Sequence, residues 1–141
     1  MLCGSRLGVA LALVLLAPSG TRAHDPGLSD LSVVLDAGHV EASWWIDQAD
    51  LAETEPQAAG ALRLEIGGTA ADLADGGARS TWDGHRHLTF EWKRSGSDPL
   101  RLAAPLLDQL PLGHRVLVRV IAADGTLREA TLSARDPGLD L

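Results

Sequence analysis

A histidine that directly follows a predicted export signal is the sharpest chemical feature of the chain. Cleavage after Ala23 would make His24 the first residue of the mature protein. A terminal histidine presents its α-amine and its imidazole Nδ1 together, and these two nitrogens can chelate one metal ion. Nitrogen-rich sites of this kind suit copper or nickel ions. Because Pro26 has no amide hydrogen, its nitrogen cannot become a further ligand, and any other ligand must come from a distant side chain.

Three further histidines are candidate partners of that chelate: His85, His87 and His114. His85 and His87 lie two positions apart in a segment that predicts a strand, so their side chains should project to one face about 6–7 Å apart. His114 precedes a strand after Pro-Leu-Gly. A solvated His-x-His pair and a structural histidine before a strand are the ordinary alternatives. We therefore expect a copper or nickel site at His24, His85, His87 and His114, or no site at all.

Enzymatic chemistry finds little support in the motifs. The sequence contains no Gly-x-Ser-x-Gly elbow, no phosphate-binding loop and no His-Glu-x-x-His motif. Its one cysteine, Cys3, lies in the predicted leader and cannot act as a nucleophile in the mature domain. Acidic residues are frequent but scattered through predicted turns, where solubility explains them. We expect a protein that is not an enzyme.

Residues 1–23 have the three parts of a cleavable secretory signal. Arg6 supplies the positive charge, Leu7–Ala17 forms an apolar run of 11 residues, and the polar stretch that follows ends with Thr21 and Ala23 at the positions that signal peptidase reads. A helix needs about 20 apolar residues to cross a bilayer, so this run predicts a signal and not an anchor. We expect a periplasmic or secreted protein that is not embedded in the membrane after cleavage.

Charge and cysteine content narrow the possible partners and the source of stability. The whole chain has a net charge of −7, and cleavage removes two arginines and no acid, which leaves −9 on the remaining 118 residues. Nucleic acids and anionic lipids bind cationic surfaces, so neither is an expected partner. Without cysteine the mature domain can form no disulfide. A chain of this length is one domain and can be stabilised by its packed core alone.

Alternation of apolar and polar residues, interrupted by Gly and Asp, dominates the mature chain and predicts strands. One short helical turn is expected within 47–55, and Ala123-Asp124-Gly125-Thr126 is a strong hairpin signal. Weaker patterns suggest two short strands, 70–73 and 79–82, around the Asp75-Gly-Gly turn. The clearer predicted strands are 31–35, 40–46, 62–66, 85–93, 100–104, 115–121 and 126–133.

Seven or eight short strands at this spacing imply an all-β fold, an immunoglobulin-like two-sheet β-sandwich, with a small barrel as the alternative. The sandwich should span residues 24–135, followed by a flexible C-terminal tail over 136–141. Within it, alternation places Trp44 and Trp92 on core faces. Trp45 falls on the opposite face from Trp44, so it is either covered by other strands or exposed as a platform for a sugar or a partner.

Two stretches resemble a known family. The mature start, HDPGLSDL from His24, is similar to the opening of the extracytoplasmic N-terminal domain of HupE/UreJ-like membrane proteins, and LLDQLPLGHRVLVRVIAADGTL over 106–127 is similar to the stretch that closes it. The resemblance implies a β-sandwich outside the membrane, in a family linked by name to nickel handling. Family members continue into transmembrane helices, which this sequence lacks after Asp136, so their transport activity does not carry over.

Two functions from different classes remain open at this stage. The first is a non-enzymatic exported β-sandwich that binds copper or nickel through His24 in a metal-handling system, with a membrane permease as a possible partner. The second is a structural or protein-interaction module of the periplasm without a ligand of its own. Histidine nitrogens that converge on one point would favour the first, and scattered histidines would favour the second.

Overall fold

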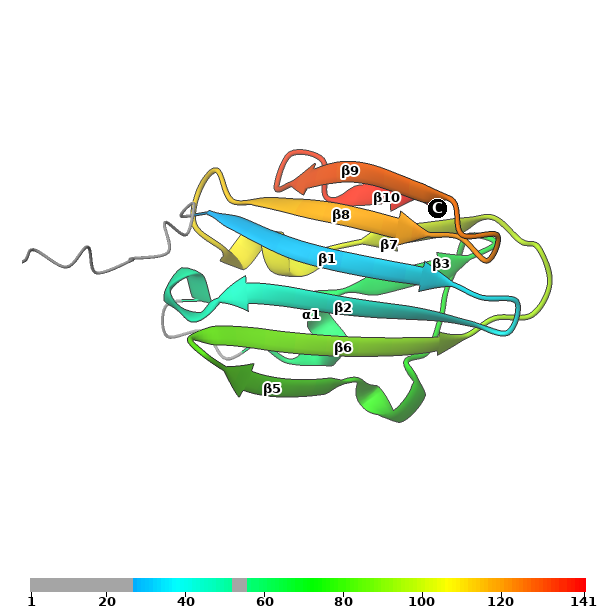
Figure 1. The fold of residues 1–141 in the computed structure, drawn as a ribbon, viewed down its shortest axis with the longest axis horizontal. Helices are drawn as coiled ribbons and strands as arrows, with labels where there is room; N and C mark the ends of the chain where they lie inside the picture. Colours follow the sequence, from blue (N-terminus) through cyan, green and yellow to red (C-terminus); the bar gives the residue numbers. More distant parts are fainter. Residues whose placement is uncertain (1–26, 52–55) are drawn as a thin grey trace, which may run out of the picture.

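Two β-sheets packed face to face form the part of the chain that the structure, a computed structural model, describes: residues 27–51 and 56–141 (Figure 1). The predicted signal peptide and His24 lie outside these residues. Ten strands occur in the described ranges, and the helical segments there are short. The expected all-β architecture with two layers is thus confirmed.

The larger sheet has six strands in the order β5-β6-β2-β1-β8-β9. Neighbouring strands are antiparallel, except that β1 runs parallel to β8. The pairing of β1 with β8 joins the first described strand to one near the end of the chain. In chain order these strands are β1 (Leu28–Leu35), β2 (His39–Asp47), β5 (Ala78–Trp82), β6 (His85–Lys93), β8 (Arg115–Ile121) and β9 (Leu127–Ser133).

The smaller sheet has four antiparallel strands in the order β10-β7-β3-β4. Its strands are β3 (Arg63–Ile66), β4 (Thr69–Ala70), β7 (Leu100–Ala103) and β10 (Gly138–Asp140). One α-helical turn and three 3-10 turns connect the strands of the two sheets. These turns are η1 (Gln48–Leu51), α1 (Ala58–Ala61), η2 (Ala74–Gly76) and η3 (Pro105–Gln109).

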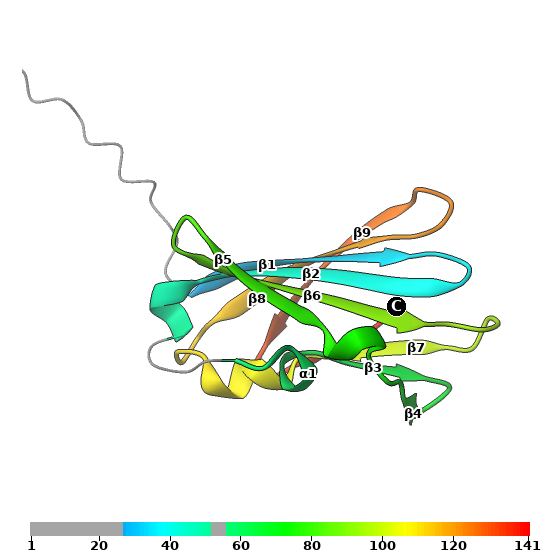
Figure 2. The ribbon, with the colours of Figure 1, turned by 90° about the horizontal axis from the view of Figure 1, so that it is seen from below.

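The hydrophobic core lies between the two sheets, which Figure 2 shows in profile as separate layers. Strict alternation along β2 and β6 sends Trp44, Leu88 and Trp92 inward, where each is almost fully buried. Phe90 and Trp92 stack with parallel rings 5.7 Å apart. Leu106 and Leu107 of η3 add apolar side chains to this core. The period-two pattern therefore fixes which face of each long strand is buried.

The segment from residue 69 to 82 differs from its prediction. Both short strands exist, but they belong to different sheets: β4 pairs with β3 of the smaller sheet, and β5 pairs with β6 of the larger one. The chain changes sheet at η2, where Asp75 has φ +53° and Gly77 has φ +74°. Gly77 also leaves no room for a side chain, since a Cβ there would lie 2.9 Å from the Ala58 Cβ and 3.1 Å from the Thr89 carbonyl oxygen.

The prediction of a flexible tail over 136–141 is wrong, because part of this segment forms a strand. Residues 138–140 form β10, an edge strand that pairs with β7. Leu141 donates its backbone N–H to the Leu100 carbonyl, and Arg101 forms an ion pair with Asp140 at 2.8 Å. Asp136, which was expected to begin a loose end, instead closes a turn over Ala134 and Arg135 by forming a bridge with Ser133, and a strand of only three residues follows. So short a strand carries too little alternation to be recognised in the sequence.

Candidate functional site

The two histidines of β6 lie together on the outer face of the six-stranded sheet, as their spacing predicts. In the register, His85 is opposite Asp47 and His87 is opposite Trp45. His85 donates a hydrogen bond through Nδ1 to the Asp83 carbonyl oxygen at 2.9 Å. His87 Nε2 lies 2.7 Å from the Ser43 hydroxyl oxygen. Partial burial lowers the pKa of His87 below its usual value of 6.5, so its imidazole is neutral at pH 7.

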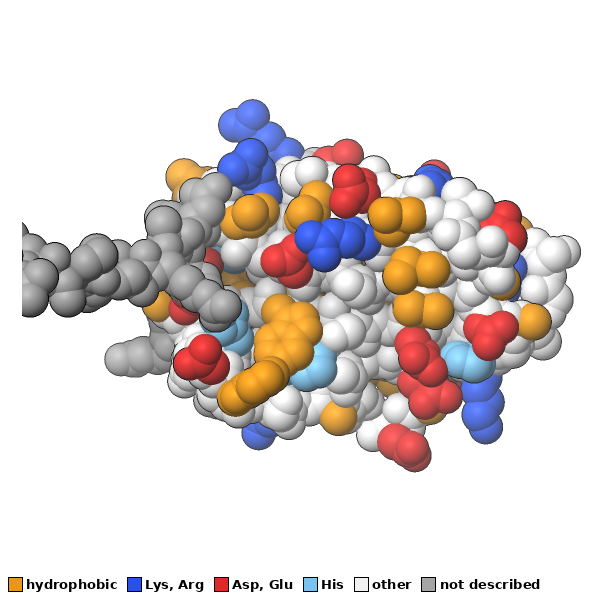
Figure 3. Space-filling view, viewed as in Figure 1, with side chains coloured by type: hydrophobic (Ala, Val, Ile, Leu, Met, Phe, Trp, Pro, Cys, Tyr) orange, Lys and Arg blue, Asp and Glu red, His pale blue; other side chains and the backbone are white. Residues whose placement is uncertain are grey.

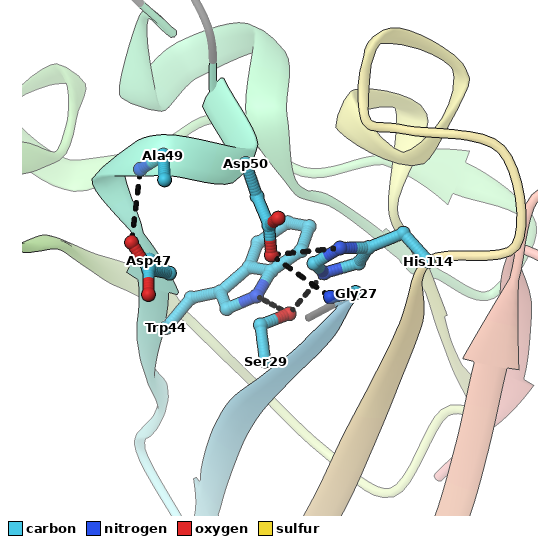
Figure 4. Close-up of polar contacts among 7 residues, drawn as sticks. All are labelled: Gly27, Ser29, Trp44, Asp47, Ala49, Asp50 and His114. Carbon is cyan, nitrogen blue, oxygen red and sulfur yellow. Dashed lines mark hydrogen bonds and ion pairs between the residues drawn. The ribbon is translucent and has the colours of Figure 1, made fainter. Parts of the chain in front are cut away.

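His114 lies on the opposite side of the same sheet, inside the sandwich, and is only 2% exposed. Its Nε2 is 2.9 Å from the Ser29 hydroxyl oxygen, which also accepts the Trp44 indole N–H at 2.9 Å (Figure 4). Its Nδ1 is 3.4 Å from Asp50 Oδ2, close enough for an ion pair but without hydrogen-bond geometry. Asp50 Oδ2 also accepts the Gly27 backbone N–H at 3.3 Å.

Burial decides the protonation of His114. Desolvation lowers the pKa of the imidazole, and the negative charge of Asp50 raises it by a smaller amount. The ring is therefore neutral at pH 7. The Ser29 oxygen accepts from Trp44 and shares a second hydrogen bond with His114 Nε2, whose direction is set by the tautomer of the ring. These hydrogen bonds join Ser29 at the start of β1, Trp44 in β2 and His114 directly before β8.

The order Asp50, His114, Ser29 has the connectivity of a catalytic acid–base–nucleophile relay, and its environment argues against that use. A nucleophilic hydroxyl must reach a substrate carbon, but Ser29 is 3% exposed and its oxygen is contacted by both Trp44 and His114. We interpret the trio as a buried polar network that stabilises the fold. Ser29 and Asp50 lie 85 and 64 positions from His114, so no spacing in the sequence points to it.

The structure therefore brings together only part of the predicted metal site. His85 and His87 share the outer face, whereas His114 lies on the inner side with the sheet between them. His24 lies outside the described residues. Within those residues, no group of three or more histidines and acids is arranged to hold a metal ion. His114 contacts Ser29 and Asp50 and does not join the β6 pair.

Two tryptophans form an aromatic patch on the outer face beside the β6 histidines. Trp45 stacks on the His87 ring with centroids 3.9 Å apart and planes only 9° from parallel. Trp82, at the end of edge strand β5, is 72% exposed and lies 6.2 Å from Trp45 at an angle of 58°. Figure 3 shows this face, where an elongated hydrophobic cluster lies next to histidine side chains. We call Trp45, Trp82 and His87 the outer aromatic patch.

A hollow of about 460 Å³ continues from this patch along the strands. Ser43 and Thr89 line it, and they lie two residues from Trp45 and His87 on the same strands and the same face. Two residues along a strand are about 6.5–7 Å, so patch and hollow are contiguous. Farther along, Glu41 and Glu91 face each other across β2 and β6, and both line the hollow. The sequence predicts the outward position of Trp45 but not this hollow, because the turn around η2 forms part of it.

No family model matches this chain, and no curated protein matches it. The resemblance to the HupE/UreJ-like domain thus stays a prediction. Within residues 27–51 and 56–141, no helix is both long and apolar enough to cross a membrane.

Proposed function

We propose that the chain is an exported, non-enzymatic binding module that contacts its ligand through the outer aromatic patch of the six-stranded sheet. The observation that carries the proposal is the position of Trp82, whose side chain is 72% exposed on an edge strand and lies against Trp45. A large apolar side chain kept in water reduces solubility without adding to the core. Contact surfaces are where such side chains are enriched, since tryptophan contributes strongly when a partner covers it.

The division of the four tryptophans supports this proposal. Trp44 and Trp92 are fully buried and account for the core. Trp45 and Trp82 lie on the other side of the same sheet and leave the core unaffected. On this outer face the neighbouring positions are polar, among them Ser43, Ser80 and Thr89. An aromatic centre with a polar surround is the usual anatomy of a recognition surface.

The proposal also covers the type of sandwich, the cellular location of the protein and its partner. We propose an immunoglobulin-like sandwich that residues 1–23 direct out of the cytoplasm, with a membrane protein of a metal-handling system as its partner. The signal sequence, the absence of cysteine after residue 23 and the family resemblance support it. Fractionation of the native host, with mass spectrometry of the recovered chain, should find it outside the cytoplasm and starting at residue 24.

Photo-crosslinking in living cells tests the binding surface. A photoreactive benzoylphenylalanine replaces Ser80, which lies directly opposite His87 on the outer face, or Leu112, a fully exposed residue before β8. Ultraviolet light should give a discrete adduct from position 80 and none from position 112. Equal adducts from both positions, or none from position 80, would contradict a binding role of this face. Leu112 is the matched control because it is likewise an exposed position, with its side chain fully accessible to solvent.

A copper or nickel site at His24 is the second candidate, and the strand register favours it. β1 begins at Leu28, and the same end of the sheet carries Asp47 and His85, which are opposite each other. His87 follows on the same face. Two imidazoles thus lie on the outer face at the end of the sheet where β1 begins. These imidazoles and the terminal chelate would hold the copper or nickel ion.

Calorimetry with Cu(II) and Ni(II) tests the second candidate on protein that starts at His24. The affinity should fall when one residue is added before His24, because the α-amine is then lost. It should also fall below pH about 6.5, where imidazoles bind protons in place of metal. An unchanged affinity in the extended protein would exclude the terminal chelate. An unchanged affinity in a His87→Gln variant would exclude the β6 histidine pair as a ligand, and it would not exclude the terminal chelate.

A further inference from the structure

We propose that the outer aromatic patch and its adjoining hollow bind a carbohydrate without acidic groups, with one sugar ring stacked on an indole and a neighbouring ring in the hollow. This inference rests on the proposed binding function and names its ligand class. It draws on the geometry of the two tryptophans, the hydrogen-bonding groups of the hollow and the charge of the surface.

The aromatic patch offers flat apolar surface of the kind that a pyranose ring covers. The C–H bonds of one sugar face are apolar, while its hydroxyl groups point outward around the ring edge. Trp82 is largely exposed, and Trp45 is held nearly parallel to the His87 ring beneath it. The planes of the two indoles are inclined by 58°, so the rings do not stack face to face on each other. An indole in this position is both apolar and able to donate from its N–H, which suits an amphipathic ligand.

The hollow supplies the hydrogen-bond partners that hydroxyl groups require. Ser43 and Thr89 contribute hydroxyls next to the patch, and Glu41, Glu91 and Asp75 contribute carboxylates farther along. A carboxylate accepts hydrogen bonds from up to two neighbouring hydroxyls of one ring, and such charge-assisted bonds are the stronger ones. The volume of about 460 Å³ lies in the range of small-ligand sites.

Two like charges in the hollow favour a ligand rich in donors. Glu41 and Glu91 are directly opposite on adjacent strands, an arrangement that destabilises a sheet when nothing compensates it. Of these two glutamates, Glu41 is contacted by His39, whose Nε2 lies 3.1 Å from Glu41 Oε1. Sugar hydroxyls that donate to both carboxylates would lower this repulsion on binding.

Charge selects among carbohydrates. The residues that line the hollow include three carboxylates and no lysine or arginine, and the chain has a net charge of −7. An acidic polysaccharide would meet repulsion at close range and across the whole surface. Neutral sugars and amino sugars meet no such repulsion, so they are the expected class of ligand. A protein partner covering the same patch is the alternative that the test must separate.

Calorimetry on the protein from residue 24 to 141 tests the ligand class directly. The probes are neutral hexasaccharides of glucose, xylose and mannose, a hexasaccharide of N-acetylglucosamine, and an oligogalacturonate as the acidic counterpart. At least one neutral probe should bind, and the acidic one should not. Trp82→Ala should weaken binding at least tenfold and Glu91→Gln several-fold, whereas Leu112→Ala, at a fully exposed site away from the patch, should leave it unchanged.

Three outcomes would overturn the carbohydrate assignment: no binding of any neutral probe, preferred binding of the acidic probe, or equal affinity in Trp82→Ala. Unfolding curves of each variant show whether a loss of binding reflects misfolding, and because Trp82 is exposed its variant should unfold like the unsubstituted protein. The photo-crosslinking experiment distinguishes a failure of the carbohydrate assignment from a failure of the proposed binding function. A protein adduct from position 80 together with no sugar binding removes the carbohydrate and leaves the binding module.

Discussion

Trp44 and Trp45 are neighbours in the sequence and lie on opposite sides of one sheet. Trp44 is fully buried and donates its indole N–H to Ser29, in a network that also contains His114 and Asp50. Trp45 points outward and joins Trp82 in a patch that solvent reaches. Strand alternation thus divides one residue type between the buried core and the outer face of the sheet, where we propose the contact surface. The comparison teaches that stability and binding should be separable in this sheet by substitution.

The largest expected effect is the loss of stability in Trp44→Ala. Removing a buried indole leaves a cavity and loses its burial, which together cost about 3–5 kcal/mol. Urea unfolding followed by circular dichroism measures the loss. Trp44→Phe is the matched control, since it keeps much of the apolar volume and should lose less. A cost below about 1 kcal/mol for Trp44→Ala would contradict the core role of this residue.

Ser29→Ala should have the next largest effect. Its oxygen accepts from Trp44 and contacts His114, and both partners are buried. The alanine would leave two buried polar groups without this partner, at a cost of about 1–3 kcal/mol. Ser32→Ala, on the outer face of the same strand, should cost less than about 0.5 kcal/mol. Equal losses in the two variants would show that the network contributes nothing beyond its packing.

Stability should fall as pH decreases below about 6.5. Burial lowers the pKa of His114 and of His87 in the folded state, so the unfolded chain binds protons more tightly. The stability they contribute is complete above the unfolded value of 6.5 and is lost progressively toward the lower folded pKa values. The slope is at most about 1.4 kcal/mol per pH unit for each histidine. Urea unfolding at pH 7.5, 6.5 and 5.5 measures it.

His87→Gln distinguishes the two faces in that experiment. The variant should retain the part of the pH dependence that comes from His114 inside the sandwich. If the free energy of unfolding of the unsubstituted protein stays constant or rises as the pH is lowered from 7.5 to 5.5, this prediction is contradicted. Both imidazoles would then bind protons in the folded state without loss of stability.

The smallest effect on stability is expected for Trp82→Ala. The side chain is 72% exposed and lies on an edge strand, so its truncation should change the free energy of unfolding by no more than about 0.5 kcal/mol. The same urea titration measures this value. A cost as large as that of Trp44→Ala would mean that the outer patch is part of the structural core, and would remove the basis for a separate contact surface.

The long strands could be predicted because alternation is a local property. The pattern over 40–46 and 85–93 predicts β2 and β6 and the faces of their residues, including the outward position of Trp45. The hairpin at Ala123-Asp124-Gly125-Thr126 is likewise confirmed by the antiparallel pairing of β8 with β9. The shortest strands were harder to predict: β4 has two residues and overlaps its predicted range 70–73 only at Ala70, and β10 has three residues and was not predicted. The positions of both strands depend on the sheet that they join.

The arrangement of the site could not be read from the chain in the same way. The pairing of β5 with β6 brings Trp82 to Trp45, and no local pattern encodes that approach. Ser29, Asp50 and His114 meet because β1 lies beside both β2 and β8. The spacing of His85 and His87 correctly predicts a shared face, whereas the place of His114 inside the sandwich depends on tertiary packing.

The parallel pairing of β1 with β8 has a consequence for how the molecule forms. The two strands pair from Leu28 with Arg115 to Val34 with Ile121, so the centre of the larger sheet cannot close until most of the polypeptide is available. Contacts this distant in sequence slow folding. At synthesis rates of about 5–20 residues per second the first strand waits several seconds with an unsatisfied edge. Because β8 lies in the last fifth of the sequence, the centre of the larger sheet in a newly made chain closes only after residues 115–121 have been synthesised.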